Sequence, residues 1–329
     1  MKGKEIQMET LFVSSDAVLK RKENTLFISV HGKARPFPVE KVRHIVLMSE
    51  SRLNSRLLCL CGANGVRISV FDYYGYFKGA FEPIDQSASG RVKLEQARII
   101  LDPTERMGIA RELVRGAGHN MRANLLYYRY RGEMAVDGVV QQMDAHMKKI
   151  GKASDPSSLM GIEGQLHQQY YAAWRHIDPA LDFGRRIRRP PNNPVNCLIS
   201  FLNQMTYAIV RHETCKTHLD GSLSWLHAPG NGRSSLSLDL SEPFKPLLTD
   251  VLIFRMTRKG MLKDNWFEQH DGVCLLTELG RRHVAEQFSG RLEESVQNRT
   301  YREWIYREAL NLERHVMGVA EYESFKRRI

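Results

Sequence analysis

A histidine and two acids follow one another closely in the stretch WLHAPGNGRSSLSLDLSEPFKP, residues 225–246. His227 precedes a short glycine-rich turn, and Asp239 and Glu242 stand three residues apart after it. Residues three apart are neighbours on a helix surface, so we expect both carboxylates on one helix face. Two adjacent carboxylates repel each other and raise each other's pKa unless a cation lies between them. This repulsion is a reason to suspect a metal, but a lone histidine beside a loop is usually structural and acids near a proline usually cap a helix, so the local pattern leaves both interpretations open.

A further candidate ligand is Glu163 in SLMGIEGQLHQQYY, which has Gly161 and Gly164 on either side. The downstream apolar spacing predicts a helix, and a glycine inside a helix costs about 1 kcal/mol relative to alanine. Two such glycines around an acid indicate another requirement, either close contact with a second helix or access for a ligand. The alternative is a glutamate favoured by the dipole of a helix N-terminus. His167, one turn later, could point to the same place.

The candidate ligands are one imidazole and carboxylates, a mixed and mostly hard set. Such a ligand set is suited to Mg²⁺ or Mn²⁺, whereas structural zinc is usually bound by thiolate-rich sites. The five cysteines are odd in number, and most lie in apolar stretches such as LLCLC and GVCLL. We therefore expect buried, reduced thiols and neither a disulfide framework nor a zinc knuckle.

The composition limits the classes of partner. The 329 residues include 48 Lys and Arg against 37 Asp and Glu, a formal charge of +11 that favours a polyanion such as nucleic acid or an anionic membrane surface. A membrane-surface role would call for a basic amphipathic helix with a strong aromatic face, which the sequence lacks. No apolar run approaches the roughly 18 residues of a membrane span, and the opening MKGKEIQMETLF does not resemble a signal peptide. The sequence predicts a cytoplasmic protein without a membrane partner.

The elements that must position these residues change type along the chain. In residues 1–85, short β-rich segments are separated by charged or Gly-containing turns, as in a small antiparallel sheet. These segments are TLFVS, TLFISV, HIVLM, VRISVFD and GYFKGAF, with one short helix in LNSRLLCLCGANG. From about residue 90 apolar residues recur at spacings of three and four, typical of packed amphipathic helices. We predict an α+β protein with a small β-rich domain (1–85) followed by a larger all-α domain (86–329) that carries the candidate ligands.

Two breaks divide the helical part. In GKASDPSSLMG, Ser157 or Ser158 could cap the helix that carries Glu163. In RRIRRPPNNPVNC, a Pro-Pro turn leads to Asn193 as N-cap with Pro194 at the first helical position. The helix that follows has a core-facing apolar stripe of Val195, Leu198, Ile199, Leu202, Met205 and Ile209. Four arginines before the turn could contact DNA phosphates or form a solvated face: Arg185, Arg186, Arg188 and Arg189.

Four segments together resemble a known family. GIEG, RRPPNNPVNCLISF, WLHAPGNGRSSLSLDLSEPFKP and YREWIYREALNLERHVMGVAEYESF are similar in order and spacing to the CRISPR-associated adaptation integrases, a family of metal-dependent DNA endonucleases. The resemblance extends from the β-rich start to the last helix. The chain departs from the family pattern at Asn193, where Asp is common, and at Asn203, where Tyr is frequent. Asn193 keeps a competent N-cap, and neither position is a candidate ligand.

The resemblance implies roles for individual residues. It implies that Glu163, His227 and Glu242 bind the catalytic metal, Mg²⁺ or Mn²⁺. Asp239 matches a nearby acid of the family and is expected behind the ligands rather than on the metal. Lys245 stands where the family usually has Arg or Lys, a residue suited to a DNA phosphate.

The resemblance also implies an assembly and a reaction. The expected assembly is a homodimer formed through the β-rich domain, with two such dimers bridged by a small dimeric partner protein. The expected substrates are short duplex DNA fragments and CRISPR repeat DNA. Attack by a fragment's 3′-hydroxyl on a phosphodiester at the repeat would insert a new spacer, and attack by water at the same site would be endonuclease cleavage.

Two other classes of function share part of this pattern. A general repair nuclease would use the same ligands to cut branched DNA without joining ends. A non-enzymatic DNA-binding scaffold would need none of the ligands. A strand-joining assay separates the first class from an integrase, and removal of the ligands separates the second.

Overall fold

The computed structural model describes residues 9–84, 88–228 and 234–328. They form two compact units, Met1–Gln86 with Lys263–Ser289, and Ser87–Leu262 with Gly290–Ile329. A β-rich region precedes a helical one, so the predicted fold class is confirmed. The expected boundary after residue 85 falls at 85–87, outside the described residues. Residues 263–289, expected in the helical part, belong to the first unit.

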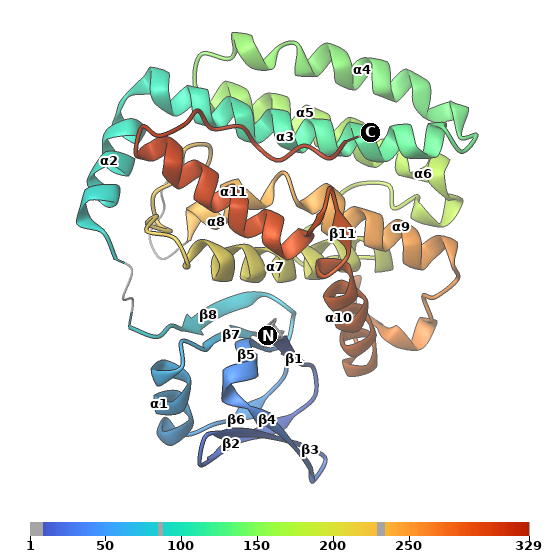
Figure 1. The fold of residues 1–329 in the computed structure, drawn as a ribbon. Helices are drawn as coiled ribbons and strands as arrows, with labels where there is room; N and C mark the ends of the chain where they lie inside the picture. Colours follow the sequence, from blue (N-terminus) through green and yellow to red (C-terminus); the bar gives the residue numbers. More distant parts are fainter. Residues whose placement is uncertain (1–8, 85–87, 229–233, 329) are drawn as a thin grey trace. The chain divides into compact units, whose positions relative to one another are not determined.

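The first unit contains two four-stranded sheets (Figure 1). One has the order β1 (Glu9–Val13), β5 (Val42–Leu47), β7 (Arg67–Phe71), β8 (Phe77–Phe81). The other has the order β4 (Lys33–Pro38), β3 (Thr25–Val30), β2 (Ala17–Lys22), β6 (Ser51–Arg52). The expectation of one antiparallel sheet is wrong, because β1 pairs with β5, β5 with β7, and β2 with β6 in parallel.

The parallel pair β5 and β7 is joined through helix α1 (Ser55–Ala63), the helix expected from the sequence. Parallel strands need such a crossover, which a tight hairpin cannot supply. The Asn54 side chain starts α1 by accepting a hydrogen bond from the Leu57 amide at 3.1 Å. Leu57 then packs in the core of the unit with Leu19, Ile45 and Ile68.

Residues 263–289 add a hairpin and most of a helix to the first unit. They contain β9 (Phe267–His270), antiparallel to β10 (Val273–Leu276), and most of α10 (Glu278–Leu292). The Phe288 ring of α10 packs edge-on against Phe12 of β1, with centroids 6.4 Å apart. The prediction of an all-α domain over residues 86–329 did not include this hairpin.

The helical unit consists mainly of α-helices, and Figure 1 shows α3, α4 and α5 side by side, in agreement with their packing contacts. The helices are α2 (Gly90–Leu101), α3 (Pro103–Arg129), α4 (Asp137–Met147), α5 (Pro156–Ala172), α6 (Trp174–Ile177), α7 (Pro194–Thr214), α8 (Ser235–Ser241), α9 (Val251–Arg258) and α11 (Tyr301–Val316). A π-helical turn, Pro246–Asp250, precedes α9, and two short strands, β11 (Ser295–Val296) and β12 (Arg299–Thr300), precede α11. None of the described helices is long and apolar enough to cross a membrane.

Capping side chains set where the site-bearing helices begin. α7 starts as predicted, with the Asn193 carboxamide accepting from the Asn196 amide at 2.9 Å and Pro194 in the first turn. The N-cap of α5 is Asp155 and neither of the predicted serines. Its carboxylate accepts from the Ser158 amide at 3.0 Å, and Ser158 completes the capping box from the third helical position.

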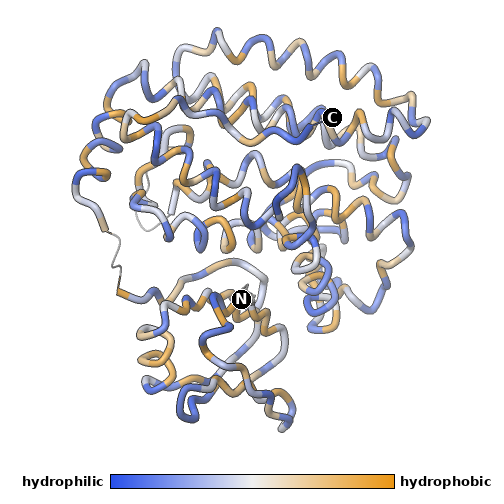
Figure 2. Tube along the Cα trace, viewed as in Figure 1, coloured by the Kyte–Doolittle hydropathy of each residue, from blue (hydrophilic) through white to orange (hydrophobic). Residues whose placement is uncertain are grey.

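The core of the helical unit fixes α5 and α7 in place. All six apolar residues of the predicted α7 stripe are buried. After α5, the Trp174 indole packs edge-on against Phe254 of α9, with centroids 4.7 Å apart, and against Tyr170 at 5.7 Å. Figure 2 shows apolar stretches recurring between polar ones along the helices, as expected for helices with one buried face.

Candidate metal centre

Glu163 and His167 lie one turn apart on α5, so their side chains share a face of the helix. The His167 Nε2 atom is 3.6 Å from Glu163 Oε1. A Cβ atom added to Gly161 or Gly164 would meet no described heavy atom within 4 Å. Among the described residues, close helix contact therefore does not explain these glycines, and access for a ligand stays a prediction.

Glu242 reaches the same place from the end of α8. It is 3% exposed, and its Oε2 atom lies 3.6 Å from His167 Nε2, beyond hydrogen-bonding distance. Within the described part of the chain, this buried oxygen has no hydrogen-bond partner. Ligand atoms of Glu163, His167 and Glu242 all lie within 4.8 Å of one another. Two carboxylates and an imidazole thus surround one point, with a buried oxygen left unsatisfied.

The electrostatics of this group favour positive charge. Burial lowers the pKa of His167, but the Glu163 and Glu242 carboxylates outweigh burial and raise it to about 9. Burial raises the pKa of Glu242, but Lys245 and His167 outweigh burial and hold it well below its usual range. The two carboxylates therefore favour a protonated imidazole. A divalent cation in the same place would also balance their negative charge.

His227 lies in the loop between α7 and α8 and is held by Asp239. The His227 Nδ1 atom is 2.8 Å from Asp239 Oδ1. Burial lowers the pKa of His227, but Asp239 raises it, and Glu242 and Glu163 add to the increase. Because the carboxylate accepts from Nδ1, a neutral ring has its lone pair on Nε2, the atom that could bind a metal.

Of the predicted ligands, the structure brings Glu163 and Glu242 together, with His167 as their nearest imidazole. His227 is outside the group that lies within 4.8 Å. Its coordination of the metal stays a prediction. The i,i+4 spacing from Glu163 is the sequence signal that points to His167. The glycine-rich turn after His227 falls largely at 229–233, outside the described residues.

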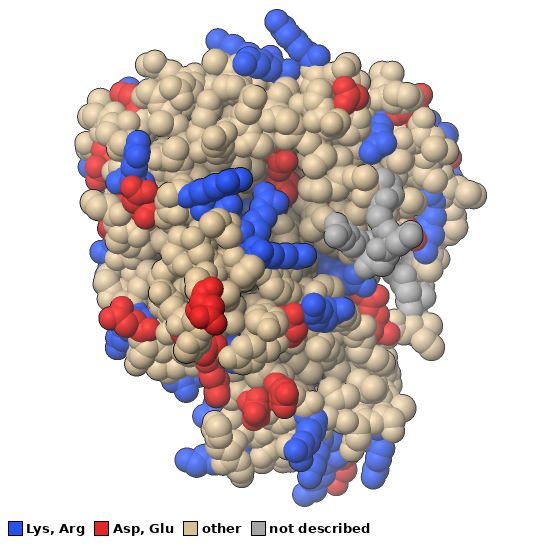
Figure 3. Space-filling view, turned by 180° about the vertical axis from the view of Figure 1, so that it is seen from behind, with Lys and Arg blue, Asp and Glu red and all other residues tan. Residues whose placement is uncertain are grey.

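The predicted phosphate-binding residues differ in environment. The Lys245 ammonium forms an ion pair with Glu242 and lies 4.9 Å from the centre of the Tyr207 ring. Its positive charge therefore balances the negative charge of the Glu242 carboxylate. Arg186 donates to Asn196 Oδ1 at 3.0 Å and to Ser200 Oγ at 2.9 Å, which ties the arginine loop to α7. The exposed members of the arginine run are Arg185, Arg188 and Arg189. Figure 3 shows that Lys and Arg side chains gather on one face of the helical unit.

Asp250, at the end of the π-helical turn, was not among the site residues predicted from the sequence. It is 2% exposed, and burial raises its pKa to about 7, against opposing effects of His167 and Tyr170. The sequence signal is an acid inside the apolar run PLLTDVLIF. This buried carboxyl group is close enough to His167 to interact with it electrostatically.

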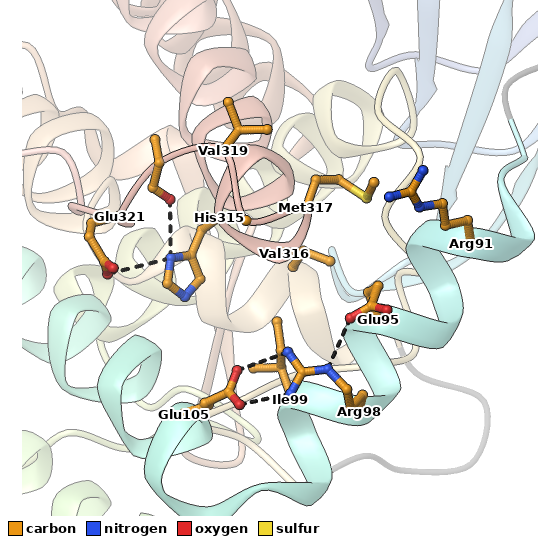
Figure 4. A pocket seen from close by; sticks show the side chains of 12 residues that line it. Arg91, Glu95, Arg98, Ile99, Glu105, His315, Val316, Met317, Val319 and Glu321 are labelled. Atoms are coloured by element: carbon orange, nitrogen blue, oxygen red, sulfur yellow. Dashed lines mark hydrogen bonds and ion pairs between the residues drawn. The ribbon is translucent and has the colours of Figure 1, made fainter.

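A separate groove of about 630 Å³ lies between α2 and the residues that follow α11 (Figure 4). Arg98 in this groove binds Glu95 at 2.9 Å and Glu105 at 2.7 Å. Glu163, His167 and Glu242 are not among its lining residues. The groove is therefore distinct from the candidate metal centre.

Comparison with known proteins identifies the family. The family described as CRISPR associated protein Cas1 matches residues 11–290. This chain belongs to the Cas1 family. A Cas1 relative from Moorella thermoacetica, named as a CRISPR-associated endonuclease, is 35% identical over 97% of this chain and 99% of its own length. A Cas1 endonuclease from Pyrococcus horikoshii is 33% identical over 97% of this chain and 98% of its own length. The family resemblance predicted from the sequence motifs is confirmed.

Solved structures agree with the Cas1 assignment. A Cas1 protein from Thermotoga maritima superposes with a TM-score of 0.88 at 31% identity, covering 97% of this chain and all of that one. A casposase bound to its integration product has a TM-score of 0.84 at 19% identity, covering 98% of this chain and 96% of that one. At that identity the likeness shows a shared fold alone. The Cas1 fold therefore extends over both units of the chain.

Proposed function

We propose that this Cas1 protein is a divalent-metal-dependent DNA endonuclease and integrase that inserts short duplex fragments into a CRISPR array. The observation that carries the proposal is the buried Glu242 Oε2 atom, which has no hydrogen-bond partner among the described residues and lies with Glu163 and His167 around one point. Relatives that match 96–97% of this chain are named endonucleases, which supports a nucleolytic use of this group.

The donor atoms fit a hard divalent cation. Glu163 and Glu242 offer carboxylate oxygens, and His227 offers Nε2, because Asp239 occupies its Nδ1. Carboxylates with one imidazole suit Mg²⁺ or Mn²⁺. When bound, such a cation supplies positive charge that stabilises the phosphoryl group in the transition state.

The remaining residues prepare the centre and hold the DNA. Asp239 fixes the His227 ring, and Lys245 partly neutralises Glu242, which lowers the repulsion between that carboxylate and a phosphate. The exposed Arg185 and its neighbours bind phosphates beside the centre. Water as the nucleophile gives cleavage, and the 3′-hydroxyl of a fragment gives strand transfer at the repeat.

The proposed partners follow from the resemblance to relatives. We place self-association in the β-rich unit and the catalytic centre in the helical unit, with a small dimeric protein bridging two Cas1 homodimers. A structural neighbour of this chain is a Cas6-RT-Cas1–Cas2 complex, with a TM-score of 0.87 at 18% identity over 99% of this chain and 37% of that one. That likeness is consistent with assembly on a second protein, and sedimentation of the full-length chain with and without such a protein tests it.

The deciding experiment is a strand-transfer assay with a labelled duplex fragment and a plasmid that carries a CRISPR repeat. Mn²⁺- or Mg²⁺-dependent joining of fragment to plasmid supports the proposal. Cleavage of branched DNA without joining would instead indicate a repair nuclease. DNA binding with neither reaction, unaltered by Glu163→Ala and Glu242→Ala, would indicate a scaffold.

A further inference from the structure

Helix α3 binds the chain directly beside Glu242. Asn120 of α3 is fully buried and donates from Nδ2 to the Pro243 carbonyl at 2.8 Å and to the Phe325 carbonyl at 3.0 Å. Its Oδ1 atom accepts from the Arg327 amide at 2.9 Å. One carboxamide thus joins the residue after a candidate metal ligand to the C-terminal end of the chain.

The Pro243 carbonyl needs a donor from outside its own segment. A helical carbonyl accepts from an amide three or four residues later. Pro246, three residues later, has no N–H, and the Leu247 amide donates to Phe244 at 3.0 Å instead. The Asn120 carboxamide therefore replaces a lost helical bond, and a buried carbonyl left without a donor would be costly.

A second asparagine repeats this arrangement one turn along α3. Asn124 donates from Nδ2 to the Pro246 carbonyl at 2.8 Å and to the Tyr170 hydroxyl at 2.9 Å. The spacing of the two asparagines places both on one face of α3. The segment from Glu242 to Pro246 is therefore bonded to α3 at both of its prolines.

The C-terminal strap, defined as residues 320–328, packs against the same segment. It runs along α3 (Figure 1), and the Phe325 ring stacks on Phe244 with centroids 5.6 Å apart and planes 5° apart. A Cβ atom on Gly116 of α3 would lie 2.3 Å from Ser324 Oγ and 3.4 Å from Pro243 Cγ, so only glycine admits both. The buried Glu308 carboxylate of α11 anchors the strap by accepting from Ser324 Oγ at 2.8 Å.

We propose that Asn120 and Phe325 are positioning residues that fix the backbone beside Glu242, so that its carboxylate is in place for the metal. This inference rests on the proposed function, since it assigns Glu242 as a ligand. Among the described residues, the carboxylate has a hydrogen bond from Lys245 at Oε1, while Oε2 has none and lies 3.6 Å from His167 Nε2. Its location therefore also depends on the chain at Pro243 and Phe244, which contacts both α3 and the strap.

The first test measures Mn²⁺ binding by the full-length protein from the electron paramagnetic resonance signal of the free ion. Asn120→Ala and Phe325→Leu should each weaken Mn²⁺ binding by about tenfold or more, as is typical for residues that orient a metal ligand. Met107→Ala is the matched control, because Met107 is buried on the same helix more than three turns from Asn120. It should destabilise the fold while leaving Mn²⁺ affinity within about twofold of wild type. Wild-type affinity in the folded Asn120 and Phe325 variants would overturn the proposal.

The second test needs no metal. Hydrogen exchange of the full-length Asn120→Ala protein should be faster at the Leu247 and Leu248 amides and unchanged along α9. Phe325→Leu provides the same comparison if the Asn120 variant does not fold. Exchange that is unchanged at these amides, or accelerated equally throughout the helical unit, would refute a positioning role. Failure of the wild-type protein to bind Mn²⁺ would refute the metal centre itself, and the exchange result would still decide whether these residues hold the segment.

Discussion

The carboxylate of Asp239 binds both the imidazole and the backbone of His227. Its Oδ1 atom accepts from the His227 amide at 3.0 Å and lies 2.8 Å from Nδ1. Its Oδ2 atom accepts from the amides of Trp225 at 2.7 Å and Leu226 at 2.9 Å. With both oxygens engaged and the side chain fully buried, Asp239 is suited to orient His227 rather than to coordinate a metal.

Glu163→Ala, His227→Ala and Glu242→Ala should each abolish metal-dependent cleavage and strand transfer. DNA affinity should be nearly unchanged, because ground-state binding rests on many phosphate contacts away from the metal. Because the ligands act as a unit, a double variant should be scarcely worse than either single one. The measurements are Mn²⁺-dependent turnover, DNA binding and thermal unfolding of the same preparations. Normal turnover of His227→Ala with a lowered melting temperature would leave His227 a purely structural role.

His167→Ala tests which imidazole binds the metal. His167 lies 3.6 Å from both Glu163 and Glu242, whereas His227 has the better oriented ring. We expect His167→Ala to retain measurable strand transfer and His227→Ala to retain none. The reverse pattern, measured with the same substrate and metal concentration, would make His167 the ligand.

Asp239→Asn should reduce metal affinity or turnover by roughly 10- to 100-fold, less than loss of a direct ligand. The carboxamide cannot accept four hydrogen bonds as the carboxylate does, so the ring of His227 loses its fixed orientation. Titration of Mn²⁺ against the variant and against Glu242→Ala compares the two effects. Equal and complete loss in both variants would indicate that Asp239 is itself a ligand.

Arg185 and Arg186 should respond differently to substitution. Arg185→Ala should lower DNA affinity and reduce the slope of log binding constant against log salt by about 0.9 if it contacts one phosphate. Arg186→Ala should instead destabilise the fold by about 1–3 kcal/mol, because the buried Asn196 and Ser200 lose a partly buried donor. Salt titrations and chemical unfolding of both variants check this. Unaltered stability of Arg186→Ala would show that its bonds to α7 contribute little.

The stability of the helical unit should fall as pH rises from about 4.5 to 7. Burial raises the pKa of Glu308 to about 7, against the opposing hydrogen bonds from Tyr322 and Ser324. The usual value in an unfolded chain is about 4.3, so the folded state binds this proton more tightly. The resulting stabilisation is complete below the unfolded pKa and is lost as pH rises through the folded one. Urea unfolding across this range should show a flatter pH profile for Glu308→Gln, and identical profiles would contradict the assignment.

Local chemistry in the sequence determined much of this protein. Asn193 and Pro194 marked the start of α7, and the apolar stripe after them marked its buried face. The spacing of Asp239 and Glu242 predicted two acids on one helix face, and that prediction stays untested because Glu242 follows the last residue of α8. These features depend on neighbours a few residues apart, so periodicity and capping chemistry suffice to predict them.

Only the tertiary structure decided which distant groups meet. The parallel pairing of β1, β5 and β7, and the return of residues 263–289 to the first unit, depend on contacts between segments far apart in the chain. The same holds for Lys245, which faces Glu242 and not solvent, and for Arg186, which is bound to α7. A residue type gives the charge a side chain carries, but burial and the partners brought by the fold decide what that charge does. For this reason the sequence predicted the chemistry of the centre, and the fold decided that His167 lies between its two carboxylates.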